Sequence, residues 1–236
     1  MADRTAQPAD GVGVNPTYST AIFLWNGVAP TKNQINAATA TSKGTNTSGS
    51  DGQFQYMSNT DGAMSWSITP PATTYTLVLG LVFPDASRGP SKLIAIPSGN
   101  FRLETYTTGG GVYLNYIHTG SAAAAAIVTG VGGFDTQMWT YVLRYNGTSL
   151  ISYLKRGDDS VMTTTTETLG YSNTGSAAIE IGDTAGGNGI YAAMLIPSDI
   201  GDTEAQALRD NIWRAFAPES GSSTTPLKRK LLLGVG

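Results

Sequence analysis

WTYVLRYNGTSLISYLKRG, residues 139–157, has the residue pattern of a β-hairpin. In its first half, large apolar residues alternate with smaller or polar ones, at Trp139, Tyr141, Leu143 and Tyr145. Asn146 and Gly147 follow where a tight turn needs a positive φ, which these two residues tolerate best. The returning half places Leu150, Ser152 and Leu154 on one face and Ile151 and Tyr153 on the other. We therefore predict two antiparallel strands joined at Asn146-Gly147.

A second segment, YTLVLGLVF at residues 75–83, is apolar on both of its alternating faces. One face carries Tyr75, Leu77, Leu79, Leu81 and Phe83, and the other carries Thr76, Val78, Gly80 and Val82. A strand of this kind belongs at the centre of a sheet that is covered on both sides.

Further short apolar runs are separated by turns rich in glycine and asparagine. They lie at residues 20–25, 92–96, 101–106, 112–118, 177–183 and 190–196. Short strands at this spacing indicate an all-β protein, an antiparallel β-sandwich.

One helix is expected near the end of the domain. Asp202 or Thr203 can cap it, and Thr203 with Gln206 has the spacing of a capping box. Its apolar face would hold Ala205, Leu208 and Ile212, with Phe216 close by, and Pro218 would end it.

These patterns divide the chain into four parts. Residues 1–20 are expected to be an extended N-terminal arm, and residues 21–52 a first strand followed by a long surface loop. Residues 53–218 form the β-sandwich domain with its one short C-terminal helix, and residues 219–236 are a polar spacer and a C-terminal tail.

Composition excludes several classes of function. The 236 residues include only 13% charged residues and have a net charge of −3, which argues against a nucleic-acid partner. The chain has no cysteine, so disulfides and thiolate metal sites are excluded. Its first residues lack the apolar core of a signal peptide, and no run reaches membrane-spanning length, so we expect neither a signal peptide nor a membrane partner.

Three stretches, taken in order, resemble the concanavalin A-like lectin/glucanase superfamily, specifically its laminin-G-like and pentraxin-like jelly rolls. They are residues 139–157, residues 178–218 and the preceding meander from Gln53. The ending NIWRAFAP is similar to the Asn-Pro-Trp-x-x-Phe-x-Pro close of such domains in bacteriophage virion proteins, with Ile212 in place of the proline. This resemblance implies a jelly roll with a binding or structural surface, on virions a capsid decoration, neck or tail-fibre component.

The acidic residues of this sequence do not fit the catalytic pattern of a glycoside hydrolase well. Glucanases of this superfamily need several acidic side chains along one strand. Glu180 and Asp183 come nearest, but their spacing puts them on opposite faces of a regular strand, and Glu104 stands alone. The only histidine, His118, has no accompanying nucleophile motif. We predict a protein that is not an enzyme, and a glycoside hydrolase is the weakest alternative.

Two kinds of ligand remain open. The resemblance implies calcium in the rim loops, where the candidate ligands are Asp158, Asp159 and Asp183; no other cofactor is expected. A glycan-binding surface would use outward aromatic rings with polar companions, and the candidates are Tyr106, Tyr113, Asn115, Tyr116 and His118.

The C-terminal tail combines basic and apolar residues: Leu227, Lys228, Arg229, Lys230, Leu231, Leu232, Leu233 and Val235. It lacks helical or strand periodicity and is too short to span a membrane. Exposed leucine clusters aggregate, so this tail is expected to dock into another polypeptide, with residues 219–226 as its spacer.

The sequence thus favours a non-enzymatic bacteriophage structural protein, assembled in the host cytoplasm and located on the virion. Its expected partners are other virion structural proteins and further copies of itself. The alternative is a glycan-binding module for attachment to a host surface.

Overall fold

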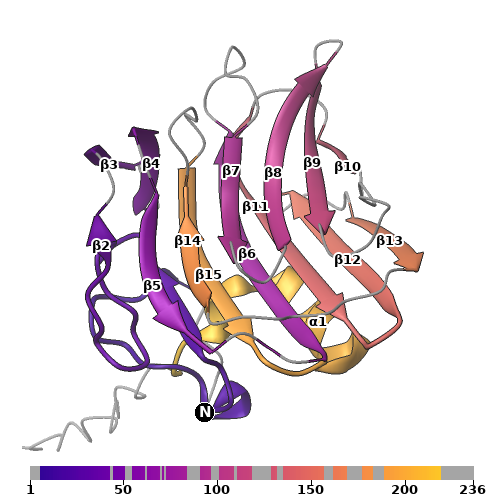
Figure 1. Cartoon of the computed structure of the whole chain (residues 1–236), viewed down its shortest axis with the longest axis horizontal. Helices are drawn as coiled ribbons and strands as arrows, with labels where there is room; N and C mark the ends of the chain where they lie inside the picture. The colour runs from indigo at the N-terminus through magenta and orange to yellow at the C-terminus, as the bar shows by residue number, and fades with distance from the viewer. Residues whose placement is uncertain are drawn as a thin grey trace, which may run out of the picture.

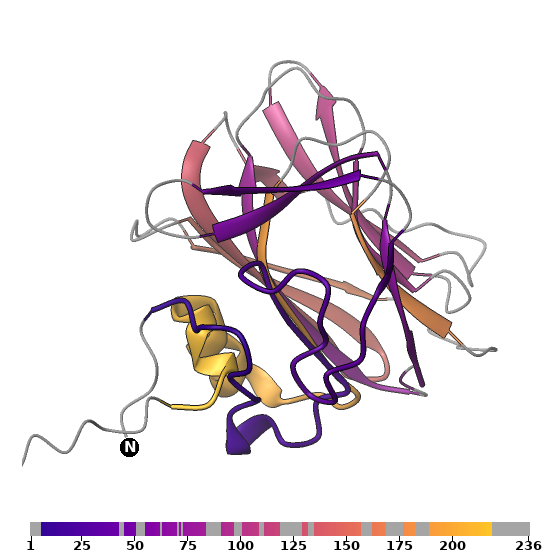
Figure 2. The ribbon, with the colours of Figure 1, turned by 90° about the vertical axis from the view of Figure 1, so that its left-hand side faces the viewer.

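The protein is a sandwich of two antiparallel β-sheets with a short helix packed outside one of them (Figures 1 and 2). The computed structural model describes residues 6–42, 45–50, 55–61, 63–69, 71, 73–83, 91–96, 101–108, 111–118, 129–131, 135–156, 162–168, 177–182 and 189–218. The predicted all-β sandwich with one short helix is confirmed.

The first sheet has eight strands in the described residues, in the order β13-β12-β11-β6-β15-β4-β3, with β1 also paired to β15. Their bounds are β1 Phe23–Asn26, β3 Thr45–Ser50, β4 Gln55–Asp61, β6 Tyr75–Phe83, β11 Asp135–Tyr145, β12 Ser149–Arg156, β13 Met162–Thr168 and β15 Gly189–Ile196.

The second sheet has seven strands in the same described ranges, in the order β10-β9-β8-β7-β14-β5-β2. Their bounds are β2 Thr41–Ser42, β5 Met64–Ile68, β7 Ser91–Ile96, β8 Phe101–Thr108, β9 Gly111–His118, β10 Thr129–Val131 and β14 Ala177–Ile181. This sheet faces the viewer in Figure 1, and the eight-stranded sheet lies behind it.

Strand β6 lies at the centre of the eight-stranded sheet and is buried on both faces, as predicted. Leu77, Leu79 and Leu81 belong to the core between the two sheets. Val78 and Val82 belong to a second core on the other side of β6, beneath the helix α1 (Gly201–Asp210) and the 3₁₀ helix η2 (Ile212–Ala215). The two-sided apolar pattern of β6 therefore reflects two separate cores.

The hairpin of β11 and β12 has the predicted faces, but its turn differs by one residue. Tyr141 pairs with Leu154 and Tyr145 with Leu150, as the alternation requires. The Asn146 N–H donates to the Ser149 carbonyl at 3.1 Å, so the two central turn residues are Gly147 and Thr148. Gly147 has the positive φ, 102°, and the Asn146 side chain instead accepts hydrogen bonds from the turn backbone.

Helix α1 buries Ala205 and Leu208, as predicted, but the predicted capping box is wrong. The N-cap residue is Ile200, which has no side-chain cap, and the carboxylate of Asp199 accepts from the Gly201 N–H at 3.1 Å. The helix also ends before Pro218. Asn211 is extended, with φ of −150°, and its side chain accepts from the Trp213 N–H to begin η2.

A charged cluster ties α1 to the sheet. Arg144 of β11 donates to both carboxylate oxygens of Asp199, at 2.6 and 2.9 Å, and also to Asp202. Arg144 also donates to the hydroxyl of Tyr153, and that hydroxyl donates to Asp202. Burial alone lowers the pKa of Arg144, but hydrogen bonds to Asp199 and Tyr153 raise it overall, so this arginine stays charged.

The same cluster also shifts the pKa values of Asp202 and Tyr153. The hydrogen bond from Tyr153, with the nearby charge of Arg144, lowers the pKa of Asp202 below its ordinary value. Burial, with the hydrogen bond to Asp202, raises the pKa of Tyr153. Since these contacts link β11 and β12 to the start of α1, the cluster fixes where the helix sits on the sheet.

The described part of the N-terminal arm, residues 6–20, packs on the domain instead of extending from it. Val14 forms an antiparallel bridge with Phe216, the Asn15 N–H donates to the Ala215 carbonyl at 2.9 Å, and the Ala217 N–H donates to Gly13. Tyr18 is 2% exposed, and its hydroxyl donates to Glu204 of α1. Burying Tyr18 supplies the free energy that a purely polar arm would lack.

The expected surface loop also differs from the structure. Residues 45–50 form β3, which pairs with β4 at the edge of the eight-stranded sheet. These residues are threonine, asparagine, serine and glycine, and such a polar run gives no apolar alternation from which a strand can be predicted.

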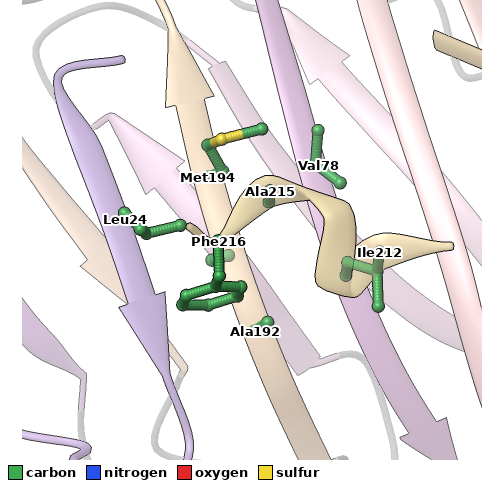
Figure 3. A pocket seen from close by; sticks show the side chains of 8 residues that line it. Leu24, Val78, Ala192, Met194, Ile212, Ala215 and Phe216 are labelled. Atoms are coloured by element: carbon green, nitrogen blue, oxygen red, sulfur yellow. The ribbon is translucent and has the colours of Figure 1, made fainter. Parts of the chain in front are cut away.

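Gly80 allows η2 to approach the sheet closely. A Cβ at this position would lie 2.9 Å from Cδ1 of Ile212 and 3.4 Å from Cβ of Tyr191. Ile212 also lines a small apolar hollow under η2, which leaves no room for a water molecule (Figure 3). Cδ1 is the far end of the Ile212 side chain, so it can shift slightly to relieve this contact, whereas the sheet backbone cannot.

We predict that Gly80→Ala changes the free energy of unfolding by less than about 1 kcal/mol, because the one close contact is with the terminal methyl of Ile212, which needs only a small shift. Gly80→Val should cost about 1 to 3 kcal/mol by overpacking. Urea unfolding measures both. Removing Cδ1 with Ile212→Val should reduce the cost of Gly80→Val, and additive effects of the two substitutions would contradict this explanation.

We predict that Asp202 stabilises the fold only above about pH 4, its ordinary pKa range. Because its folded pKa lies below 3.8, the carboxylate favours the folded state above that pH and loses this effect as the pH falls through the folded pKa. Its side chain is 68% exposed, so the contribution should be under about 1 kcal/mol. Denaturant unfolding of wild type and Asp202→Asn from pH 2.5 to 7 provides the comparison. A stability difference that does not shrink on acidification would refute the assignment.

Candidate ligand-binding face

Only one of the two outward sheet faces is left open by the described chain. The outward face of the eight-stranded sheet is covered by α1, η2 and the N-terminal segment, which together enclose the second core. The outward face of the seven-stranded sheet lies on the opposite side from α1 (Figure 2). This open face is where a ligand can reach a sheet surface.

Alternation along the strands identifies which residues lie on the open face. Trp66, Leu103 and Ile179 belong to the core between the sheets, so their neighbours point the other way. The described residues of the open face include Ser65, Ser67, Ala95, Arg102, Glu104, Ala178 and Glu180. Ser67 and Arg102 are exposed, whereas Ala95 and Glu180 are buried.

Arg102 and Glu104 of β8 form an ion pair on this face. Nε of Arg102 lies 3.0 Å from Oε2 of Glu104, and their side chains are 49% and 15% exposed. The guanidinium thus remains accessible, while the carboxylate is held in place beside it. Such a pair offers a ligand fixed hydrogen-bond donors and acceptors side by side.

The register of β8 and β9 divides the predicted glycan residues between two rows. Tyr106 pairs with Tyr113, and Asn115 pairs with Glu104, which puts these three in the open-face row of Arg102. Tyr116 pairs with Leu103, which is fully buried. His118 lies two residues further along the Tyr116 row. By register, the five positions therefore fall in two alternating rows, and Tyr106, Tyr113 and Asn115 are those in the row of Arg102.

The other predicted sites fall outside the described residues. These are the calcium candidates Asp158, Asp159 and Asp183 and the whole tail from Leu227 to Val235. Within the described ranges, no group of three or more histidine, aspartate or glutamate residues could hold a metal ion. None of the helices in that part of the chain is long and apolar enough to cross a membrane.

The carboxylates considered for catalysis occupy different settings. Glu180 of β14 is 8% exposed and pairs in register with Ser65 and Ala95, while its proposed companion Asp183 is not among the described residues. Glu104 is engaged by Arg102. Sequence reasoning missed this pair, although the spacing of FRLE puts arginine and glutamate on one face of a strand.

Sequence reasoning also missed the cluster around Arg144. The available signal was an arginine at an alternate position of β11, two residues from the apolar Val142, since a charge on a covered sheet face needs a partner. Its donors and acceptors bind one another and join α1 to the sheet, so the cluster serves the fold and not a ligand.

Comparison with solved structures finds the same architecture in proteins of very different sequence. The binding domain of botulinum neurotoxin DC, in complex with SialylT, aligns with a TM-score of 0.56 at 8% identity, over 82% of this chain and 52% of its own. The present chain thus spans about half the length of that binding domain. A heptameric SAP-like pentraxin from Limulus polyphemus aligns with a TM-score of 0.50 at 9% identity, over 64% of this chain and 80% of its own.

The CBM2 module of the evolved Dit of Lactobacillus casei BL23 phage J-1 aligns less closely, with a TM-score of 0.49 at 10% identity, over 67% of this chain and 82% of its own. No family model matches the sequence. No curated protein matches it either. At such low identity the likeness is one of fold, and the chain has a concanavalin A-like jelly-roll fold.

Proposed function

We propose that this chain is a non-enzymatic carbohydrate-binding module that holds its ligand on the open face of the seven-stranded sheet. The observation that carries this proposal is the row formed by β8 and β9. Arg102 and Glu104 form a fixed polar pair there, and the register adds Asn115, Tyr106 and Tyr113 beside them.

This combination suits a sugar. A sugar ring presents C–H groups to an aromatic face and hydroxyls to hydrogen-bonding groups, and tyrosine with arginine, glutamate and asparagine supplies both. The proposal is also supported by similar structures that are described as binding domains, one of them in complex with SialylT. A catalytic role has less support, because the described acids Glu104 and Glu180 are respectively paired with Arg102 and buried.

A glycan array with purified protein tests the proposal. Wild type should bind at least one class of glycan, and Tyr106→Ala and Tyr113→Ala should each weaken that binding about 10-fold, equivalent to 1.4 kcal/mol. Isothermal titration with the best glycan then gives the affinities. Absence of binding to every glycan on the array would reject the proposal for those glycans.

Two control variants separate lost contacts from lost folding. Gln206→Ala changes an exposed residue of α1, on the opposite side of the sandwich, and should leave the affinity unchanged. Tyr116→Ala alters the row of the buried Leu103, so it should lower the unfolding temperature while its folded fraction still binds. Equal loss of affinity in all four variants would contradict a site at Tyr106 and Tyr113.

We further propose that the module is a structural component of a bacteriophage virion, in a homo-oligomer or beside other virion proteins. Support comes from the sequence: the resemblance of residues 211–218 to the close of virion jelly rolls, and the basic, apolar tail at residues 227–235. In this proposal the tail docks into a neighbouring polypeptide, and the spacer keeps the sandwich clear of it.

Deletion of residues 219–236 should leave a folded domain with the same unfolding temperature and glycan affinity, because the deletion keeps α1, η2 and the hydrogen bond from the Ala217 N–H to the Gly13 carbonyl. The truncated chain should fail to join virions that incorporate the full chain, as measured by immunoblotting of purified particles. Normal incorporation of the truncation would overturn the docking role of the tail. Substituting Lys228, Arg229 and Lys230 by glutamine removes the positive charges of the tail and keeps its leucines, so it tests which of the two is needed for incorporation.

A further inference from the structure

The open face carries charges of both signs in adjacent positions. Nε of Arg102 lies 3.0 Å from Oε2 of Glu104, so the exposed cation already has an anionic partner. The register places Lys92 opposite Glu104, and Ala95 opposite both Arg102 and Glu180. Arg102, Glu104 and Lys92 thus occupy adjacent positions, with Glu180 beyond Ala95 on the next strand, and the four formal charges cancel.

We propose that this face selects neutral, hydroxyl-rich glycans over glycans that carry carboxylate or sulfate groups. This inference rests on the proposed carbohydrate-binding function and defines the ligand class of the same site. An anionic sugar that approaches Arg102 also approaches the carboxylate of Glu104 and the acidic position of Glu180, so its attraction to the guanidinium is largely cancelled.

A neutral sugar is not repelled by the carboxylates of this face. The guanidinium has five N–H donors, and one ion pair leaves several of them available to ligand hydroxyls. The carboxylate of Glu104 is 15% exposed, so it is held in one position and can accept from a hydroxyl with little loss of side-chain entropy. The pair therefore acts as a preorganised donor and acceptor without a net charge.

The neighbouring strand positions extend this polar pair. Tyr106 lies two residues along β8 from Glu104, a distance of about 7 Å at the usual rise of a strand, and Tyr113 is its cross-strand partner. One ligand can therefore meet the polar pair and the tyrosine positions together. Because none of these contacts depends on net charge, binding should be nearly insensitive to salt.

The test measures glycan selectivity and salt dependence in wild type and two charge variants. Wild type should prefer neutral glycans, with an affinity that changes less than about 2-fold between 50 and 500 mM NaCl. Glu104→Gln leaves Arg102 uncompensated, so binding to sialylated or uronic-acid glycans should rise about 5-fold or more and become sensitive to salt. Arg102→Gln should weaken binding of the neutral glycan about 10-fold.

Asp10→Asn serves as the matched control, because it breaks another exposed ion pair. Nζ of Lys32, in the loop after β1, lies 2.6 Å from Oδ2 of Asp10 in the N-terminal arm, and the two side chains are 47% and 43% exposed. This variant should bind as wild type does, and thermal unfolding of all variants checks that each is folded.

The outcomes distinguish the inference from the proposed function. A wild type that prefers anionic glycans with salt-sensitive affinity would overturn the inference while the carbohydrate-binding function stands. So would a Glu104→Gln variant with unchanged selectivity. If wild type binds no glycan of either class, the proposed function itself fails and the inference falls with it.

Discussion

The whole arrangement depends on burial of the eight-stranded sheet on both of its faces. Its central strand β6 contributes leucines to the core between the sheets and valines to the core under α1 and η2. An apolar face on the outside of a sheet must be covered, and the helix layer with the N-terminal segment does so. Because this layer covers the outward face of the eight-stranded sheet, a ligand can reach only the outward face of the seven-stranded sheet in the described part of the chain. The position of the second core therefore determines where the candidate site lies.

The helix layer is positioned by polar contacts as well as apolar ones. Valine, leucine and phenylalanine pack in several registers at similar cost, whereas the paired hydrogen bonds between Arg144 and Asp199 require one orientation. Asp199 also accepts a hydrogen bond from the N–H of Gly201, the first residue of α1, so one carboxylate contacts both the start of the helix and β11. The small glycine at position 80 then lets η2 lie close to the sheet.

The sequence predicts the parts of this fold that follow from alternation. The two faces of β6 and the rows of β11 and β12 are visible in the pattern of large and small residues, because the period of a strand is fixed. Alternation does not show three other features: the turn at Gly147-Thr148, the start of α1 and the polar strand β3. Each depends on hydrogen bonds that several residues could make. For the candidate site, the sequence suggested Tyr106, Tyr113 and Asn115 but not the Arg102–Glu104 pair. It also could not separate Tyr106 from Tyr116, because the two fall in different rows only once the register of β8 and β9 is known.

The pairing of the two ends of the described chain has a mechanical consequence. Residues 13–15 and 215–217 run antiparallel, so the path back toward the N-terminus and the path onward from Ala217 leave this contact in the same direction, on the helix side (Figure 2). Tension applied to either end would load this pairing first, and next the hydrogen bonds that join Tyr18, Glu204 and Arg214 beside α1. Force that enters through either end would therefore strain the helix layer before it reaches the seven-stranded sheet.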